Sequence, residues 1–425
     1  MIGSQNANCK DAYTVGFRDF CMRGKSKPAP FTIRRVRHPE RLSLQRGRVD
    51  RPPVPCEFLF GASNIQELFM LMVIFGAGAS YDSAEAYLPP KRQGAGRAKI
   101  FLADVSYDVQ TWRPPLANDL FLDRHHAFGN IVKRYQKLIP ILPLLRKPSR
   151  GRSIEELLES LQNEGEGYPD RQCHFAAVRY YIRDLIWEIT EKWFLQTNGV
   201  TNYAPLVDQI LSRHKSNEPV CLVTFNYDLV LETALDAFDF KRRQPDDHFN
   251  SHPTLKLFKL HGSVGWGRFV DFPADPAMTP HGLITMASSI KLSNEYTLAS
   301  PYVAQERGRL VFPAIAIPVQ TKTAETFECP PSHLAYLGEL LRSVTKILII
   351  GWQAKEAHFL ALLKLNLPTL QRVMVVTGDE GAYAILEQFK REIGSDLART
   401  AICEARTGGF TDFVVNQEGD EFFKS

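Results

Sequence analysis

The stretch Met72-Val-Ile-Phe-Gly-Ala-Gly-Ala-Ser-Tyr-Asp82 predicts a strand that leads through a glycine turn into a helix. Its first four residues form a short apolar run, and Gly76 and Gly78 follow directly. Glycines allow a backbone to approach a diphosphate, and N–H groups at a helix start point toward such an anion. The third glycine of the usual G-x-G-x-x-G pattern is absent because Tyr81 stands there, so a merely tight turn is an equal alternative. The candidate anion-binding residues are Gly76, Ala77, Gly78, Ala79 and Ser80.

The composition is that of an ordinary globular protein. The chain has 425 residues, of which 44% are hydrophobic and 23% charged, enough for one large domain or two smaller ones. A net charge of +4 is too small to predict nucleic acid as the main partner. The seven cysteines include no C-x-x-C pair, which excludes the common zinc ribbons. We find no signal peptide and no apolar run near the 18 to 20 residues, roughly, that span a bilayer, so we expect a cytoplasmic protein without membrane contact.

Residues 1–70 differ from the rest of the chain. Seven arginines fall between Arg34 and Arg51, acids are few, and prolines close the region. One interpretation is a basic arm for nucleic acid. We favour a disordered extension, or a translation start placed too early, because Met70 or Met72 would begin the protein at its first strand.

Residues 71–425 show the pattern of an α/β domain. Further apolar strands are expected at 219–224, 255–260, 346–350, 372–376 and 400–403. Helices fit between them at about 230–237, 333–344, 355–366 and 380–393. This alternation predicts a Rossmann-like, doubly wound parallel sheet.

A helical module interrupts this pattern at about 113–215. Ser153 and Glu156 form a capping box, and helical periods cover 173–195 and 203–214. The segment 265–331 is rich in proline, and we expect it to cross the active-site face without regular structure.

Polar residues follow three of the expected strands, at the edge where ligands bind to open parallel sheets. They lie in Thr224-Phe-Asn226-Tyr-Asp228, in Leu260-His261-Gly-Ser263 and in Gly351-Trp-Gln353. Asp228 could cap the following helix or contact a ligand, whereas Asn226 is harder to explain as a cap. A lone histidine such as His261 is more often a core residue, but at a strand end it is a plausible base.

These motifs, with Gly76-Ala-Gly-Ala-Ser80 before them and Gly408-Gly-Phe-Thr-Asp412-Phe after them, resemble the sirtuin-like family over about residues 72 to 415. The chain is most similar to the bacterial branch used in antiphage defence. The deacetylase branch carries a four-cysteine zinc module and a Gly-Ile-Pro-x-Phe-Arg element, and both are absent here. The resemblance therefore implies plain NAD+ cleavage, with NAD+ as the substrate and neither zinc nor another cofactor.

The resemblance also assigns roles to the residues. Breaking the bond between nicotinamide and ribose builds positive charge on the ribose, as in glycoside hydrolysis. Asn226 would orient the ribose or the attacking water, and His261 would accept a proton, since histidine titrates near neutral pH. Asp228, if it is not a cap, would contact the nicotinamide amide. The turns holding Gly351, Trp352 and Asp379 would bind adenosine.

The leading hypothesis is an NAD+ glycohydrolase that depletes the cell of NAD+. An NAD-dependent deacylase or ADP-ribosyltransferase is a second hypothesis, and a non-catalytic NAD or ADP-ribose sensor is a third. Because an always-active NADase would kill its host, we expect activity to be controlled by homo-oligomerisation or by a partner. By resemblance, that partner would be a HerA-type ATPase or a short Argonaute-like protein.

Overall fold

The computed structural model describes residues 70–83, 112–123, 128–146, 153–164, 168–197, 199–213, 219–273, 275–318, 327–394, 396 and 400–424. All of them belong to one compact unit, Ile65–Ser425. The prediction of a basic, disordered extension over residues 1–70 falls outside the described residues, apart from Met70.

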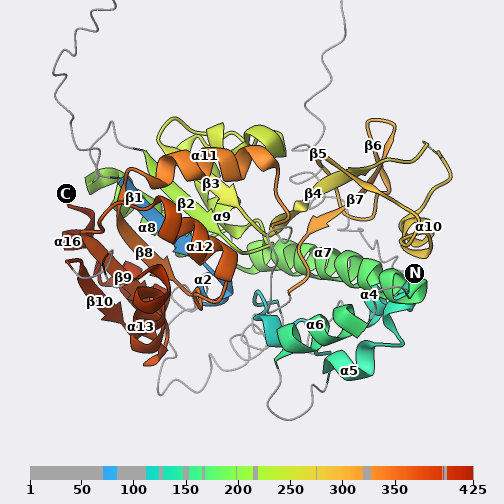
Figure 1. The fold of residues 1–425 in the computed structure, drawn as a ribbon, viewed down its shortest axis with the longest axis horizontal. Coiled ribbons are helices and arrows are strands. Elements are labelled where there is room, and N and C mark those ends of the chain that lie inside the picture. The colour runs from blue at the N-terminus through green and yellow to red at the C-terminus, as the bar shows by residue number, and fades with distance from the viewer. Residues whose placement is uncertain are drawn as a thin grey trace, which may run out of the picture. The chain divides into compact units, whose positions relative to one another are not determined.

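A six-stranded parallel sheet forms the centre of this unit, as the sequence predicts (Figure 1). Its strands are β1 (Met70–Phe75), β2 (Val220–Thr224), β3 (Leu255–Lys259), β8 (Val344–Ile350), β9 (Arg372–Val376) and β10 (Ile402–Arg406). They lie in the order β10-β9-β8-β1-β2-β3. Numbered by their appearance along the chain, this is the 3-2-1-4-5-6 order of the dinucleotide-binding fold, with its switch point between β1 and β8.

Helices cover both faces of the sheet, which confirms the doubly wound class. Alternate residues of β1, β2, β8 and β9 enter two different cores. The helices packed on one face are α11 (Pro331–Leu341), α12 (Ala357–Asn366) and α13 (Gly381–Ile393). Those on the other face are α8 (Tyr203–Arg213), α9 (Val230–Leu235), α15 (Gly409–Val415) and α16 (Asp420–Phe423).

The helical module has a core of its own. It contains α4 (Phe128–Arg134), α5 (Leu142–Arg146), α6 (Ile154–Glu164) and the long α7 (Pro169–Thr197). The capping box is present, because the Glu156 N–H donates to Ser153 Oγ at 3.1 Å and the Ser153 N–H donates to Glu156 Oε2 at 3.0 Å. One expectation differs from the structure. We placed the helix at 203–214 in this module, but α8 packs on the central sheet because its apolar face meets β1 and α9.

The segment after residue 265 is regular, contrary to our expectation. It forms a second, antiparallel sheet in the order β5-β4-β7-β6, with β4 (Gly262–Val270), β5 (Leu292–Leu298), β6 (Gln305–Glu306) and β7 (Arg309–Ile315). A short helix, α10 (Pro280–Thr285), lies between β4 and β5. Pro313 within β7 is atypical of a strand, and β5 is largely polar, so the sequence pattern did not indicate strands here. Strands β4 and β7 contact α7 and thereby join the core of the helical module.

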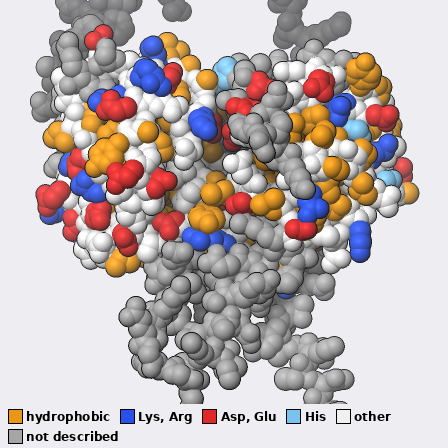
Figure 2. Space-filling model, turned by 90° about the horizontal axis from the view of Figure 1, so that it is seen from below, with side chains coloured by type: hydrophobic (Ala, Val, Ile, Leu, Met, Phe, Trp, Pro, Cys, Tyr) orange, Lys and Arg blue, Asp and Glu red, His pale blue; other side chains and the backbone are white. Residues whose placement is uncertain are grey.

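Acidic and basic side chains are interspersed on the face drawn in Figure 2, in keeping with the small net charge. Among the described residues, none of the helices has the length and apolar character that crossing a membrane requires.

Candidate functional site

A cavity of about 770 Å³ lies at the carboxyl ends of the parallel strands. Residues that follow β1, β2, β3, β8 and β9 line it, and the helical module contributes further lining residues, among them Glu155. The structure brings together these predicted site residues: Gly76, Ala77, Gly78, Asn226, Asp228, His261, Gly351, Trp352 and Asp379. Ala79 and Ser80 do not line the cavity, because they are buried behind the turn.

The glycines of the first turn are required by a close approach between two pieces of backbone. A Cβ atom on Gly76 would lie 2.5 Å from the Gly351 carbonyl oxygen, and one on Gly78 would lie 2.9 Å from Gly351 Cα. Gly351 itself has φ of +61°, which L residues rarely adopt. The turns after β1 and β8 are therefore packed together at the switch point. The structural explanation of the two glycines holds whether or not a diphosphate binds there.

Most N–H groups of the first turn already have partners within the protein, and the expected anion cradle stays a prediction. The Gly76 N–H donates to the Ile350 carbonyl at 3.0 Å, and the Gly78 N–H donates to the Gly351 carbonyl at 3.1 Å. The Ala79 N–H donates to the Gly76 carbonyl at 2.9 Å. Within the described part of the chain no partner is recorded for the Ala77 N–H, and Ala77 is exposed to the cavity. Ala77 is thus the residue of this turn that is best placed to meet a ligand.

A substitution at Ala77 tests whether an anion binds at this turn. We expect Ala77→Asp to weaken NAD+ affinity by about 10- to 100-fold, because two like charges about 4 Å apart repel by roughly 1 to 4 kcal/mol. The isosteric Ala77→Asn serves as the control without the charge. Aspartate is favourable in a first helical turn, so the fold should be kept. Calorimetric titration of both variants would measure this, and equal affinities would place the diphosphate elsewhere.

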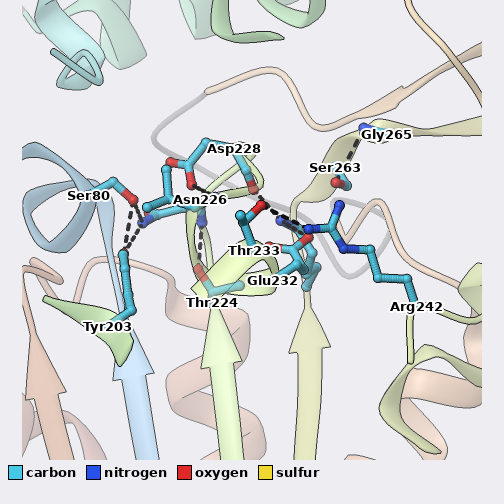
Figure 3. A network of polar contacts seen from close by, with 12 residues as sticks. Ser80, Tyr203, Thr224, Asn226, Asp228, Glu232, Thr233, Arg242, Ser263 and Gly265 are labelled. Carbon is cyan, nitrogen blue, oxygen red and sulfur yellow. Dashed lines mark hydrogen bonds and ion pairs between the residues drawn. The ribbon is translucent and has the colours of Figure 1, made fainter. Parts of the chain in front are cut away.

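Asn226 links the end of β2 to the first turn (Figure 3). Its Nδ2 donates to the Gly76 carbonyl oxygen at 2.9 Å and lies 3.0 Å from Ser80 Oγ. Ser80 Oγ is also 2.9 Å from the Tyr203 hydroxyl of α8. A carbonyl oxygen can only accept a hydrogen bond. The atom of the Asn226 amide that faces the Gly76 carbonyl must therefore be the nitrogen, Nδ2. Asn226 Oδ1 is buried and has no partner among the described residues.

His261 lies where the chain leaves the parallel sheet and enters the antiparallel one. Its side chain is 4% exposed, and its ring lies beside Phe225 and Tyr227, with centroid distances of 4.8 Å and 6.3 Å. The next residue must be glycine, because Gly262 has φ of +81° and a Cβ there would lie 2.0 Å from the Ala314 carbonyl oxygen. The aromatic pair therefore fixes the imidazole plane, and the glycine fixes the backbone that carries it.

Asp228 precedes Leu229, the N-cap residue of α9, and binds the first turn of that helix. Its Oδ1 accepts a hydrogen bond of 3.0 Å from the Val230 N–H at the start of α9. Burial raises the pKa of Asp228, and Lys259 opposes that shift. The fully buried Lys259 ammonium donates to the Asp228 carbonyl oxygen and forms a 2.7 Å ion pair with Glu232. A buried ionic cluster thus supports this wall of the cavity.

The residues assigned to adenosine have structural roles as well. The Trp352 side chain is 2% exposed, stacks on Phe225 at 5.3 Å and donates from Nε1 to Glu356. Its indole is therefore part of the core that backs His261. Asp379 is exposed and accepts a 3.0 Å hydrogen bond from the Gly381 N–H at the start of α13. Contact of either residue with adenosine stays a proposal.

Three residues near the cavity escaped sequence reasoning. Arg113 is buried, donates from Nε to the Tyr81 carbonyl oxygen, and places its guanidinium carbon 3.7 Å from the centre of the Tyr81 ring. Both residues line the cavity. Tyr203 reaches the site from α8, and no local pattern distinguishes it from a core tyrosine. Burial and the nearby Asp228 raise the pKa of Tyr203, so its hydroxyl keeps its proton.

Asp82 explains why a glycine stands at position 409. Its Oδ2 accepts hydrogen bonds from the Phe410 and Thr411 N–H groups at the start of α15. A Cβ on Gly409 would lie 2.6 Å from that oxygen. The motif at 408–413 therefore holds α15 against the segment that follows the glycine turn.

No group of three or more metal-ligating side chains is found among the residues that the structure describes.

Comparisons with known proteins give structural neighbours only. No protein-family model matches the chain, and no curated protein matches it significantly. Among solved structures, the chain is similar to a Sir2 homologue mutant in complex with 2′-O-acetyl ADP-ribose, with a TM-score of 0.34 and 13% identity over 84% of this chain and 90% of that chain. A Sir2 homologue–NAD complex aligns with a TM-score of 0.33 and 13% identity, covering 82% and 88% of the two chains. A Sir2 homologue mutant bound to ADP-ribose aligns with a TM-score of 0.34 and 14% identity, covering 83% of this chain and 93% of that chain. TM-scores of this size support no conclusion about function. The proposals below are therefore based on the residues of the site.

Proposed function

We propose that this protein hydrolyses NAD+ to nicotinamide and ADP-ribose in the cavity. The observation that carries the proposal is the convergence of the Ala77 turn, the Asn226 amide and the His261 ring on one cavity at the carboxyl edge of the sheet. In sheets with this strand order, dinucleotides bind across the crevice at the switch point. The motifs at these three places are also the ones whose sequences resemble the sirtuin-like family.

The Asn226 amide supports a role in orienting the substrate. Leaving a buried acceptor such as its Oδ1 without a partner costs about 1 to 3 kcal/mol. A ribose hydroxyl or a water molecule would supply the missing donor. Since Nδ2 is held by the Gly76 carbonyl, the amide is already oriented before the substrate arrives.

The remaining groups account for the rest of the reaction. Nicotinamide leaves as a neutral base and needs no strong acid. His261 would take a proton from the water as its oxygen bonds to the ribose carbon. Arg113 and the Ala77 N–H would hold the diphosphate, with Arg113 supplying the positive charge.

Incubation of the full chain with NAD+ alone tests the proposal. We expect nicotinamide and ADP-ribose in equal amounts, quantified by liquid chromatography. Turnover only in the presence of an acylated peptide would indicate a deacylase instead. Binding of NAD+ without any turnover would indicate a sensor.

We further propose that NAD+ depletion serves antiphage defence, on the basis of the motif resemblance to that bacterial branch. Activity would then be gated by self-association or by a HerA-type ATPase or short Argonaute-like partner. NAD+ measured in cells that express the chain, before and after phage infection, should fall only after infection. An unchanged NAD+ level in infected cells would contradict this role.

A further inference from the structure

Tyr203 brings a hydroxyl group from α8 to the first turn (Figure 3). Its ring belongs to the core of the sheet, where it packs against Phe75 and Phe410 with centroid distances of 5.1 Å and 5.4 Å. The side chain is fully buried, yet its hydroxyl lies 2.9 Å from Ser80 Oγ and 3.4 Å from Asn226 Nδ2. A phenylalanine would fill the same space without burying a polar group. The core packing therefore accounts for the ring of Tyr203, and the contacts at the turn account for its hydroxyl.

The Asn226 amide nitrogen has two hydrogens to donate. The Gly76 carbonyl oxygen accepts one of them at 2.9 Å. The other is left for the hydroxyl oxygens of Ser80, at 3.0 Å, and Tyr203, at 3.4 Å. The backbone N–H of Asn226 is also held, because it donates to Thr224 Oγ1 at 3.1 Å. The protein thus fixes the backbone and the nitrogen end of this amide, and Oδ1 is the end that remains for a ligand.

The Ser80 hydroxyl would not fix the amide by itself. A serine hydroxyl can turn either its proton or a lone pair toward a neighbour. The hydrogen bond with Tyr203 restrains this rotation, because one of the two hydroxyl groups must donate to the other. Without the Tyr203 hydroxyl, Ser80 could turn its proton toward Asn226, and that arrangement favours the reversed amide with Oδ1 facing Ser80. Ser80 is 1% exposed, so bulk water does not compete for these contacts.

Resting on the proposed function, we propose that Tyr203 is a positioning residue, whose hydroxyl acts with Ser80 to hold the Asn226 amide nitrogen so that Oδ1 faces the nicotinamide ribose. Tyr203 lies behind the wall of the cavity and is not one of its lining residues, whereas Asn226 lines it. Its effect on the reaction therefore passes through Asn226. Groups that hold a substrate in its reactive geometry raise the rate, and a small displacement of such a group lowers it.

The first test is a double-mutant cycle of Tyr203→Phe and Asn226→Ala. Tyr203→Phe keeps the ring and loses only the hydroxyl. We expect it to lower kcat for NAD+ about 5- to 15-fold, which corresponds to one neutral hydrogen bond. In the Asn226→Ala background the same change should lower kcat no further, because its effect depends on the amide. An equal loss in both backgrounds would mean that Tyr203 only supports the fold, and it would overturn the inference.

Tyr180→Phe is the matched control. Tyr180 is also fully buried, but it lies in the core of the helical module, and its hydroxyl has no partner among the described residues. We expect this variant to keep the kcat of wild type. Thermal denaturation of Tyr203→Phe, Asn226→Ala and Tyr180→Phe verifies that each variant is folded.

The Asn226 amide itself gives a readout that needs no turnover. In protein made with isotope-labelled asparagine, nuclear magnetic resonance identifies its signals by their absence from Asn226→Ala. We expect the amide hydrogens of Asn226 to exchange with solvent about 5- to 15-fold faster in Tyr203→Phe, because one of their acceptors is lost. The exchange in Tyr180→Phe should equal that of wild type.

The two readouts separate this inference from the proposed function. If wild type cleaves NAD+ and Tyr203→Phe keeps both kcat and the slow amide exchange, the inference is wrong and the proposed function stands. If wild type cleaves no NAD+, the proposed function fails, and the exchange alone decides whether Tyr203 positions the amide. Exchange that is unchanged in Tyr203→Phe would overturn the inference in either case.

Discussion

The His261→Ala variant should turn over NAD+ about 10²- to 10⁴-fold more slowly than wild type, while its affinity for NAD+ stays the same. The reason is that a general base contributes to the rate and not to ground-state binding. The His261 ring lies beside Phe225 and Tyr227, and we expect its removal to leave the fold of the Ala77 turn intact. Steady-state kinetics and calorimetric titration of the same preparation would measure the two quantities.

His261→Asn is the matched control for shape. It keeps a polar side chain of intermediate size but has no group that titrates near neutral pH. We expect it to be as slow as His261→Ala. Recovery of most of the activity in this variant would show that His261 orients the substrate by hydrogen bonding instead of accepting a proton.

Lys259→Met should destabilise the protein by about 3 to 5 kcal/mol, the usual result of removing one partner of a buried ion pair. Lys259 is fully buried, and its loss would leave the buried Glu232 carboxylate without its ion-pair partner. The shift in the urea denaturation midpoint, followed by tryptophan fluorescence, would measure this loss.

The double variant Lys259→Met with Glu232→Leu tests whether the loss of stability comes from the unpaired Glu232 carboxylate. Replacing both partners of a buried pair by apolar residues is often close to neutral. We therefore expect the double variant to regain much of the lost stability. A double variant as unstable as Lys259→Met alone would mean that the hydrogen bond from Lys259 to the Asp228 carbonyl is the important contact.

Most of the parallel sheet was predictable because β1, β2, β8 and β9 are short apolar runs, each followed by a helix. The strand ends were predictable for the same reason, and so Asn226, Asp228 and His261 were found at one edge. The antiparallel sheet was not, since β5 is polar, β7 contains Pro313, and the pairing depends on partners distant in the chain.

The details of the site depend on contacts that no local pattern encodes. The sequence could not show that the Gly78 N–H is used by the Gly351 carbonyl, or that Tyr203 reaches Ser80 across 123 residues. Arg113 and Glu155 both lie in the helical module, where the sequence indicates only caps and apolar faces. Their relation to the cavity follows from how that module contacts the sheet edge.

The most direct test of the site is a crystal structure of His261→Ala with NAD+. The variant should bind the substrate without consuming it during the experiment. We predict the diphosphate at the Ala77 turn beside Arg113, and a hydroxyl of the nicotinamide ribose within hydrogen-bonding distance of Asn226 Oδ1. NAD+ bound away from Asn226, or absent from this cavity at saturating concentration, would contradict the proposed site.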